Sequence, residues 1–230
     1  MNDFLTDSVF FGAIASLAFY EIGLLLKKKL KKGWVNPLLI SIVLTIGLLL
    51  AGHIDYATYY EGAKYISYLL TPATVCLAIP LYEQFELLKK HHVAVLAGIV
   101  SGVLTSAVIV LLFAICFRFS HAEYVTFLPK SITTAIGMGV SEQLGGYVPI
   151  TVVVIIVTGI MGNVLAEPLC KLFRIHEPIA RGVAIGSASH ALGTAKAIEM
   201  GEVEGAMSSL SIAVAGILTV VASLIFAQLY

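Results

Sequence analysis

Long apolar runs separated by short polar connections are the main feature of this sequence. A helix needs roughly 20 residues to cross the hydrocarbon layer of a membrane, which is about 30 Å thick. Period-two alternation, which is typical of half-buried strands, does not recur along the chain. The pattern therefore predicts an all-α polytopic membrane protein with about six full spans, at residues 4–26, 37–52, 66–82, 93–117, 148–169 and 206–230.

Two further stretches, 126–146 and 181–205, have the length of a span but not its composition. Both are rich in Gly, Ser and Thr, and they contain Lys130, Glu142 and His190. Glycine and proline weaken a helix, and lipid cannot replace the lost backbone hydrogen bonds. Such backbone is stable at membrane depth only inside protein or beside a water-filled cavity. We predict that each stretch is a re-entrant hairpin or a helix that is unwound near its middle.

The composition agrees with a membrane protein. The 230 residues are 59% apolar and 12% charged, with no net charge, whereas a soluble domain has about 25% charged residues. These values exclude a water-soluble globule, a disordered chain and a nucleic-acid-binding protein. The three cysteines show no metal-ligand spacing, so we expect small packing residues, no disulfide, no metal and no cofactor. Pro72 and Pro80 predict a kink or a break within 66–82.

Positive charge indicates the orientation. Acidic residues precede the first apolar run and a lysine cluster at 27–32 follows it, which argues against a signal peptide and places that cluster in the cytoplasm. The basic loop 83–92 is cytoplasmic as well, because two spans separate it from this cluster. The basic loop 171–181 is also cytoplasmic if 126–146 re-enters the membrane from outside. We therefore prefer re-entry or partial crossing, with the N-terminus and the C-terminus outside, in a bacterial cytoplasmic (inner or plasma) membrane.

The first irregular stretch offers a carboxylate site. Lys130 follows a proline and precedes Ser131, Thr133 and Thr134. A cation beside hydroxyls and free backbone N–H groups suits a small organic acid. Alternatively, Lys130 extends to the membrane interface and the hydroxyls serve helix packing.

The second stretch offers a candidate for proton coupling. His190 can change its charge near neutral pH, and Glu142 is a second proton acceptor. Alternatively, His190 bridges two half-helices and Glu142 caps its helix. The substrate-binding candidates in this stretch are Ser187, Ser189, His190, Gly193 and Thr194.

Other functional classes have less support. The chain lacks the metalloprotease, nucleophile-elbow, P-loop and dinucleotide motifs, so we expect no enzyme. A pore would not require Lys and His beside interrupted helices, whereas paired interrupted segments are typical of the midplane site of a transporter. The Thr-Ala pairs at 134–135 and 194–195 suggest that the two stretches belong to inverted repeats.

The chain resembles the LrgB/CidB (YohK-type) family of antiholin-like membrane proteins over almost its whole length. One departure is Ala135, where many relatives have a proline, and it bears on where the first stretch breaks. The motifs that carry the resemblance are Asn36-Pro37-Leu38-Leu39, Pro72-Ala73-Thr74-Val75, Ala78-Ile79-Pro80-Leu81-Tyr82, Leu128-Pro129-Lys130-Ser131-Ile132-Thr133-Thr134, Gly145-Gly146, Ala180-Arg181-Gly182 and Gly186-Ser187-Ala188-Ser189-His190-Ala191-Leu192-Gly193-Thr194-Ala195.

The resemblance implies two functions. One is regulation of murein hydrolase export and cell lysis, together with a small LrgA/CidA-type partner. The other is transport of small monocarboxylates such as pyruvate or glycolate, as in the similar plastid glycolate/glycerate carriers. We expect a proton-coupled carrier of elevator-like architecture in one integral membrane domain, with scaffold helices in 1–92 and a transport core in 93–230. We also expect a homodimer or higher homo-oligomer.

Overall fold

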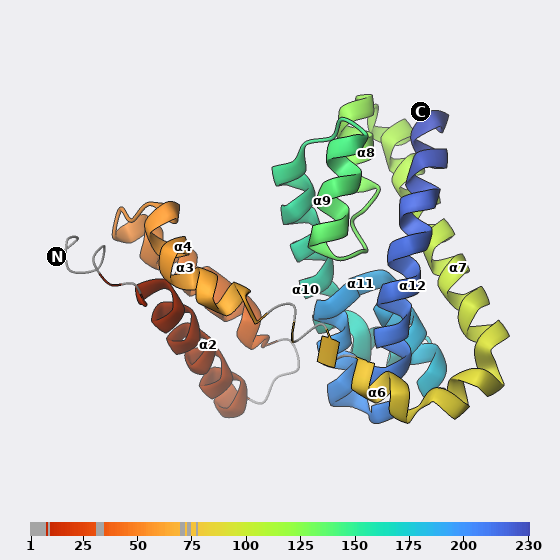
Figure 1. The fold of residues 1–230 in the computed structure, drawn as a ribbon, viewed down its shortest axis with the longest axis horizontal. Coiled ribbons are helices and arrows are strands. Elements are labelled where there is room, and N and C mark those ends of the chain that lie inside the picture. Colours follow the sequence, from red (N-terminus) through yellow and green to blue (C-terminus); the bar gives the residue numbers. More distant parts are fainter. Residues whose placement is uncertain (1–7, 9, 31–34, 70–71, 73–74, 77) are drawn as a thin grey trace. The chain divides into compact units, whose positions relative to one another are not determined.

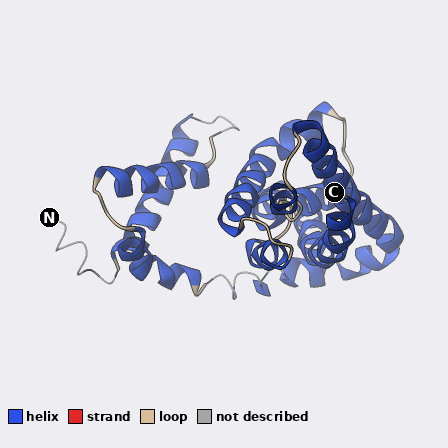
Figure 2. Ribbon diagram, turned by 90° about the horizontal axis from the view of Figure 1, so that it is seen from above, coloured by secondary structure: helices blue, strands red, loops and turns tan. Residues whose placement is uncertain are grey.

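The computed structural model describes residues 8, 10–30, 35–69, 72, 75–76 and 78–230. Helices and turns make up this part of the chain, which contains no strand (Figure 2). The start of the first predicted span, Lys31, Lys32 and the Ala73-Thr74 part of a family motif lie outside the described residues. The chain divides into two compact units, Met1–Cys76 and Leu77–Tyr230, and Figure 1 shows their elements.

The first unit contains three helices: α2 (Phe11–Leu30), α3 (Pro37–Ala51) and α4 (Tyr56–Ser67). Asn36 begins α3, because its side-chain oxygen accepts hydrogen bonds from Leu38 N and Leu39 N, and Pro37 fits the first turn. Gly12 allows α2 to approach α4 closely, since a Cβ there would meet the backbone at Ala63 N at 2.6 Å.

The predicted span 66–82 is interrupted. α4 ends at Ser67, Tyr68 and Leu69 form a turn, and the short α6 (Ala78–Glu83) belongs to the second unit. Residues 70–71, 73–74 and 77 of this range lie outside the described part of the chain. The break agrees with the expectation from Pro72 and Pro80. The boundary between the two compact units falls at Cys76.

Three long helices form the frame of the second unit: α7 (Phe85–Phe117), α10 (Val148–Leu172) and α12 (Glu202–Phe226). Within the described residues, these three are long and apolar enough to cross a membrane, and α3 is a shorter apolar helix. α7 and α12 run in the same direction, and α10 runs in the opposite one (Figure 1). They match the predicted spans 93–117, 148–169 and 206–230, although α7 begins eight residues earlier.

The side chains are distributed as in a membrane protein. Leu112, Val153 and Ile217 are more than half exposed, whereas Thr151 and Ser211 are completely buried. In water this arrangement would leave large apolar areas unburied. In lipid the apolar surface is solvated and the polar groups bond to one another. The second unit is therefore a polytopic helical membrane bundle.

Both irregular stretches form hairpins. The first hairpin consists of α8 (His121–Phe127), a turn at 128–133 and α9 (Thr134–Gln143). In the second hairpin, α11 (Pro178–Met200) is interrupted at His190, which has φ 43° and ψ −144°. Its two arms pack on the start of α12 in opposite directions, since Gly182 lies against Glu204 and Ile198 against Gly205.

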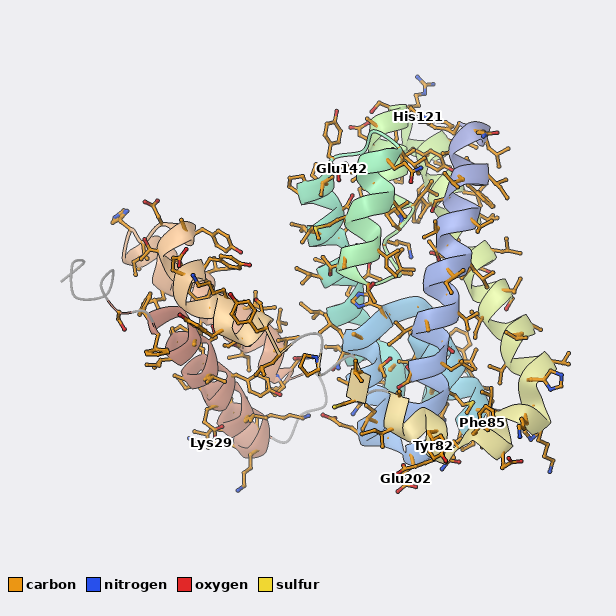
Figure 3. All side chains as sticks on the ribbon, in the orientation of Figure 1. Lys29, Tyr82, Phe85, His121, Glu142 and Glu202 are labelled. Atoms are coloured by element: carbon orange, nitrogen blue, oxygen red, sulfur yellow. The ribbon has the colours of Figure 1, made fainter. Side chains whose placement is uncertain are left out.

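The two hairpins enter the bundle from opposite ends. His121 and Glu142, near the two ends of the first hairpin, lie at one end of the unit, and Glu202, which follows the second hairpin, lies at the other (Figure 3). The long helix α10 follows the first hairpin and the long helix α12 follows the second, and these two helices are antiparallel to each other. This is the arrangement expected of inverted repeats.

Candidate functional site

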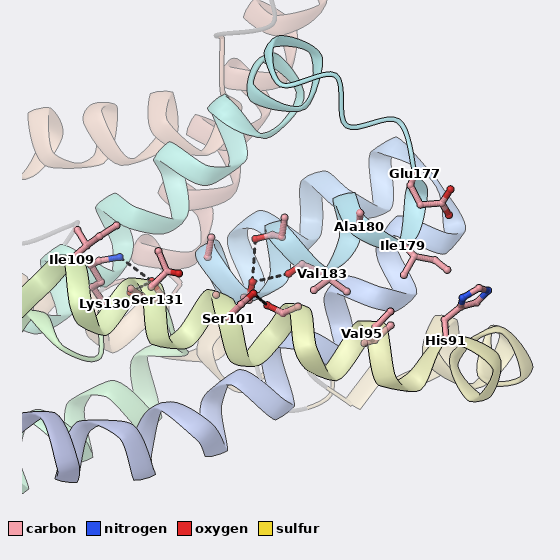
Figure 4. A pocket seen from close by; sticks show the side chains of 18 residues that line it. His91, Val95, Ser101, Ile109, Lys130, Ser131, Glu177, Ile179, Ala180 and Val183 are labelled. Carbon is pink, nitrogen blue, oxygen red and sulfur yellow. Dashed lines mark hydrogen bonds between the residues drawn. The ribbon is translucent and has the colours of Figure 1, made fainter.

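A cavity of about 780 Å³ lies between α7, the first arm of α11 and the tip of the first hairpin (Figure 4). His91 and Glu177 line it toward one end of the unit, and Lys130 and Ser131 line its other end. We call it the lysine cavity. It connects one end of the second unit with the level at which the first hairpin turns.

Small residues on α7 create the space. A methyl group at Gly102 would lie 2.9 Å from Ser187 Oγ, and one at Gly98 would lie 3.0 Å from Val183 Cγ1. The sequence analysis missed this feature, because it treated 93–117 as an ordinary apolar span. The available signal was a repeat of small residues on one helix face, spaced by three or four positions. Its members are Ala94, Gly98, Ser101, Gly102, Thr105 and Ser106.

Lys130 lies at the tip of the first hairpin and is partly buried. Its Nζ donates a hydrogen bond to Ser131 Oγ at 3.1 Å, and Ser131 Oγ lies 3.3 Å from Ser106 Oγ of α7. Within the described part of the chain, no carboxylate lies within ion-pair distance of Lys130. A partly buried cation without a protein counter-charge favours an anionic ligand.

Helix α9 begins at the same turn. Thr133 is its N-cap residue but makes no side-chain cap hydrogen bond, and Thr134 is the first helical residue. The first N–H groups of a helix have no partner within that helix, and its N-terminus carries partial positive charge. The turn therefore combines the Lys130 ammonium with a helix N-terminus, and both favour a carboxylate.

Both hairpin tips contact one small group of hydroxyl side chains, which we call the hydroxyl cluster. Ser131 comes from the first hairpin and Ser187 from the second, three residues before the break at His190. Ser187 Oγ donates to Val183 O at 2.7 Å, so its own helix satisfies it. The cluster comprises Ser106, Ser131, Ser187, Thr219 and Ser223.

His190 does not lie where a substrate-binding residue of the lysine cavity would lie. It is 4% exposed, and its Nε2 donates to the carbonyl oxygen of Ile155 in α10 at 3.0 Å. Gly159 provides space for the ring, because a Cβ there would lie 2.6 Å from His190 Cε1. The ring joins the hairpin break to α10 and does not line the lysine cavity.

The remaining candidates are spread over the second unit. Thr194 Oγ1 lies 2.7 Å from Ser208 Oγ of α12, and Ser189 packs beside Gly162 of α10. Gly193 is buried against Ile185 in the other arm of the hairpin. Glu142 is exposed near the end of α9. The structure thus brings Lys130, Ser131 and Ser187 together at one cavity, with Thr133 and Thr134 at the same turn as Lys130, and it places Ser189, His190, Gly193, Thr194 and Glu142 elsewhere.

Ion pairs hold the base of the second hairpin. Lys196 Nζ lies 3.4 Å from carboxylate oxygens of Glu167 and Glu199, which connects the second arm to α10. Arg181 Nη1 lies 3.6 Å from Glu204 Oε1, and Glu204 is almost completely buried. These pairs lie at the end of the bundle where Glu202 lies.

Fold and site together define a polytopic helical membrane protein with two helical hairpins, which enter the bundle from opposite ends, and a cation-bearing cavity. The model of the LrgB-like family matches residues 16–229, so the chain belongs to this family. It is 40% identical to the antiholin-like protein LrgB of Bacillus subtilis over 225 residues, which cover 97% of each chain. It is 42% identical to the antiholin-like protein LrgB of Bacillus mycoides over 217 residues, 94% of each chain. No solved structure matches the chain.

Proposed function

We propose that the chain is an antiholin-like protein of the bacterial cytoplasmic membrane, and that its molecular activity is transport of a small monocarboxylate through the lysine cavity. Relatives that match almost the whole chain bear the name antiholin-like protein LrgB, which supports the first part. This name favours a role in lysis control, with a small LrgA-type membrane protein as partner, over a purely metabolic role.

One observation supports the transport activity. Lys130 lies at the inner end of a cavity, at the tip of the first hairpin and without a carboxylate partner in the described residues. In a secondary carrier, the substrate site lies at such interrupted helices near the midplane. A carboxylate of two or three carbons, such as pyruvate or glycolate, would accept hydrogen bonds from Lys130 and Ser131. Ser187 lies beside the same site.

The transport activity predicts uptake by liposomes that contain the purified protein. An imposed proton gradient should drive accumulation of radiolabelled pyruvate or glycolate. Lys130→Ala should weaken substrate binding about 10- to 100-fold, the range for a charge-assisted hydrogen bond. Lys130→Arg, which keeps the charge, should retain more uptake than Lys130→Ala. Uptake at the wild-type rate in Lys130→Ala would exclude this lysine from the mechanism.

The antiholin-like role predicts a different measurement. Liposomes loaded with a fluorescent dye should remain intact with the chain alone, because a carrier has no continuous opening. A change in dye release on addition of a co-reconstituted LrgA-type partner would support lysis control by pore formation. Dye release by the chain alone would contradict the carrier activity.

A further inference from the structure

A second cavity lies on the other side of Lys130. Its volume is about 260 Å³, and apart from Lys130 its lining is apolar. Lys130 lines both this cavity and the lysine cavity. We call the second one the aromatic cavity, because its other lining residues are Val110, Phe113, Phe117, Phe119 and Phe127.

The phenylalanine rings form a continuous series. The ring centroids of Phe113 and Phe117 are 6.0 Å apart, those of Phe117 and Phe119 are 6.1 Å apart, and those of Phe119 and Phe127 are 5.5 Å apart. The last two pairs are stacked, with interplanar angles of 22° and 23°. Aromatic pairs at these distances attract each other beyond the burial of their surface.

One of the last two rings belongs to the hairpin that carries Lys130, and the other lies just before it. Phe119 lies in the connection from α7 to α8, and Phe127 is the last residue of α8. Both are half-buried and pack against the core of Val110, Tyr124 and Leu128. A movement of the hairpin tip therefore changes the Phe119–Phe127 stack, because one of its rings moves with the tip.

We propose that the aromatic cavity is the second half of the substrate path and that Phe119 and Phe127 form the gate that closes it. In the present conformation the path is wide on the side of His91 and Glu177 and blocked by aromatic rings on the side of His121. Lys130 stands between the two halves and meets the anion from either side. The identity of the anion rests on the transport activity proposed above, but the gate can be tested without transport.

The test measures access to residue 130 with a thiol reagent. In a background with Cys76, Cys116 and Cys170 replaced by serine, Lys130→Cys is exposed to a charged, membrane-impermeant methanethiosulfonate in right-side-out and inside-out vesicles. With the gate intact, labelling should be fast only from the side of His91 and Glu177. Adding Phe119→Ala and Phe127→Ala should increase labelling from the opposite side at least tenfold.

Control variants separate the gate from general loosening. Phe85→Ala removes an exposed ring at the other end of α7 and should leave both labelling rates unchanged. Phe127→Ala alone is a milder change, for use if the double variant fails to fold. It should also increase labelling from the side opposite His91 and Glu177. Opposite-side labelling that stays at the intact rate in the folded gate variants would overturn the proposal, as would fast labelling from both sides with the gate intact. Absence of uptake by the wild-type protein, together with labelling of Lys130→Cys that still follows the gate, would contradict the transport activity alone.

Discussion

The close approach of α10 to the second hairpin depends on two glycines of α10, since a Cβ at Gly159 would lie 2.6 Å from His190 Cε1 and one at Gly162 would overlap Ser189. His190 has a backbone conformation that side-chain-bearing residues rarely adopt, and its bond to Ile155 O holds it there. The ring can reach that carbonyl only because residue 159 has no side chain. His190 is therefore explained as a structural anchor of the hairpin break, with or without a role in proton transfer.

Gly159→Ala should destabilise the protein by about 1–3 kcal/mol, because the new methyl group displaces the His190 ring from Ile155. The measurement is the midpoint of thermal unfolding in detergent. Gly139→Ala is the matched control, since a Cβ there meets nothing within 4 Å and alanine favours a helix over glycine. A midpoint for Gly159→Ala equal to that of the control would contradict this account.

At the scale of the elements, the two hairpins are held in different ways. Ion pairs and hydrogen bonds join both arms of the second hairpin to α10 and α12. The first hairpin is held by hydrogen bonds, without an ion pair to α10 or α12 in the described residues: Tyr124 OH donates to Phe226 O of α12 at 3.0 Å, and Thr151 Oγ1 of α10 donates to Ser141 Oγ at 2.7 Å. Its tip contacts its neighbours through Ser131 and apolar packing. We therefore expect the first hairpin to be the more mobile one.

Glu204→Gln tests the attachment of the second hairpin. The change leaves the Arg181 guanidinium without its carboxylate in a largely buried place. Breaking a buried pair costs about 3–5 kcal/mol, and we expect about 2–3 kcal/mol because Arg181 retains some exposure. Glu86→Gln breaks an exposed pair with Lys89 and should change stability by less than about 1 kcal/mol. Equal shifts of the thermal midpoint in Glu204→Gln and Glu86→Gln would show that the Arg181–Glu204 pair does not anchor the second hairpin.

Much of this element structure could be predicted from the sequence. Dense Gly, Ser and Thr in 126–146 and 181–205 identified both interrupted stretches, because such backbone is unstable in lipid. Apolar length alone did not locate the interruption within 66–82, where a turn follows Ser67. The cavity wall on α7 was missed, since its small residues barely lower the apolar character of the helix. The separation of His190 from Lys130 could not be predicted, because it depends on packing against Gly159.

At the scale of the whole molecule, each end of the second unit carries the entrance of one hairpin. Re-entry of both hairpins requires that His121 and Glu142 lie on one side of the membrane, and Glu177 and Glu202 on the other. Single cysteines at these four exposed positions, in the cysteine-free background, should react with an impermeant reagent in two pairs from opposite sides. Labelling of His121→Cys and Glu142→Cys from different sides would show that 126–146 crosses the membrane.

The hydroxyl cluster places the tips of the two opposed hairpins against one shared boundary. Ser131 and Ser187 belong to segments that reach this level from opposite ends of the second unit, yet they adjoin the same narrow gap. Withdrawal of either tip exposes polar groups that the other tip helps to shield, and withdrawal of both exposes all of them. Withdrawal of both tips at once is thus the least favourable of these movements, so the gap couples the position of one hairpin to the position of the other.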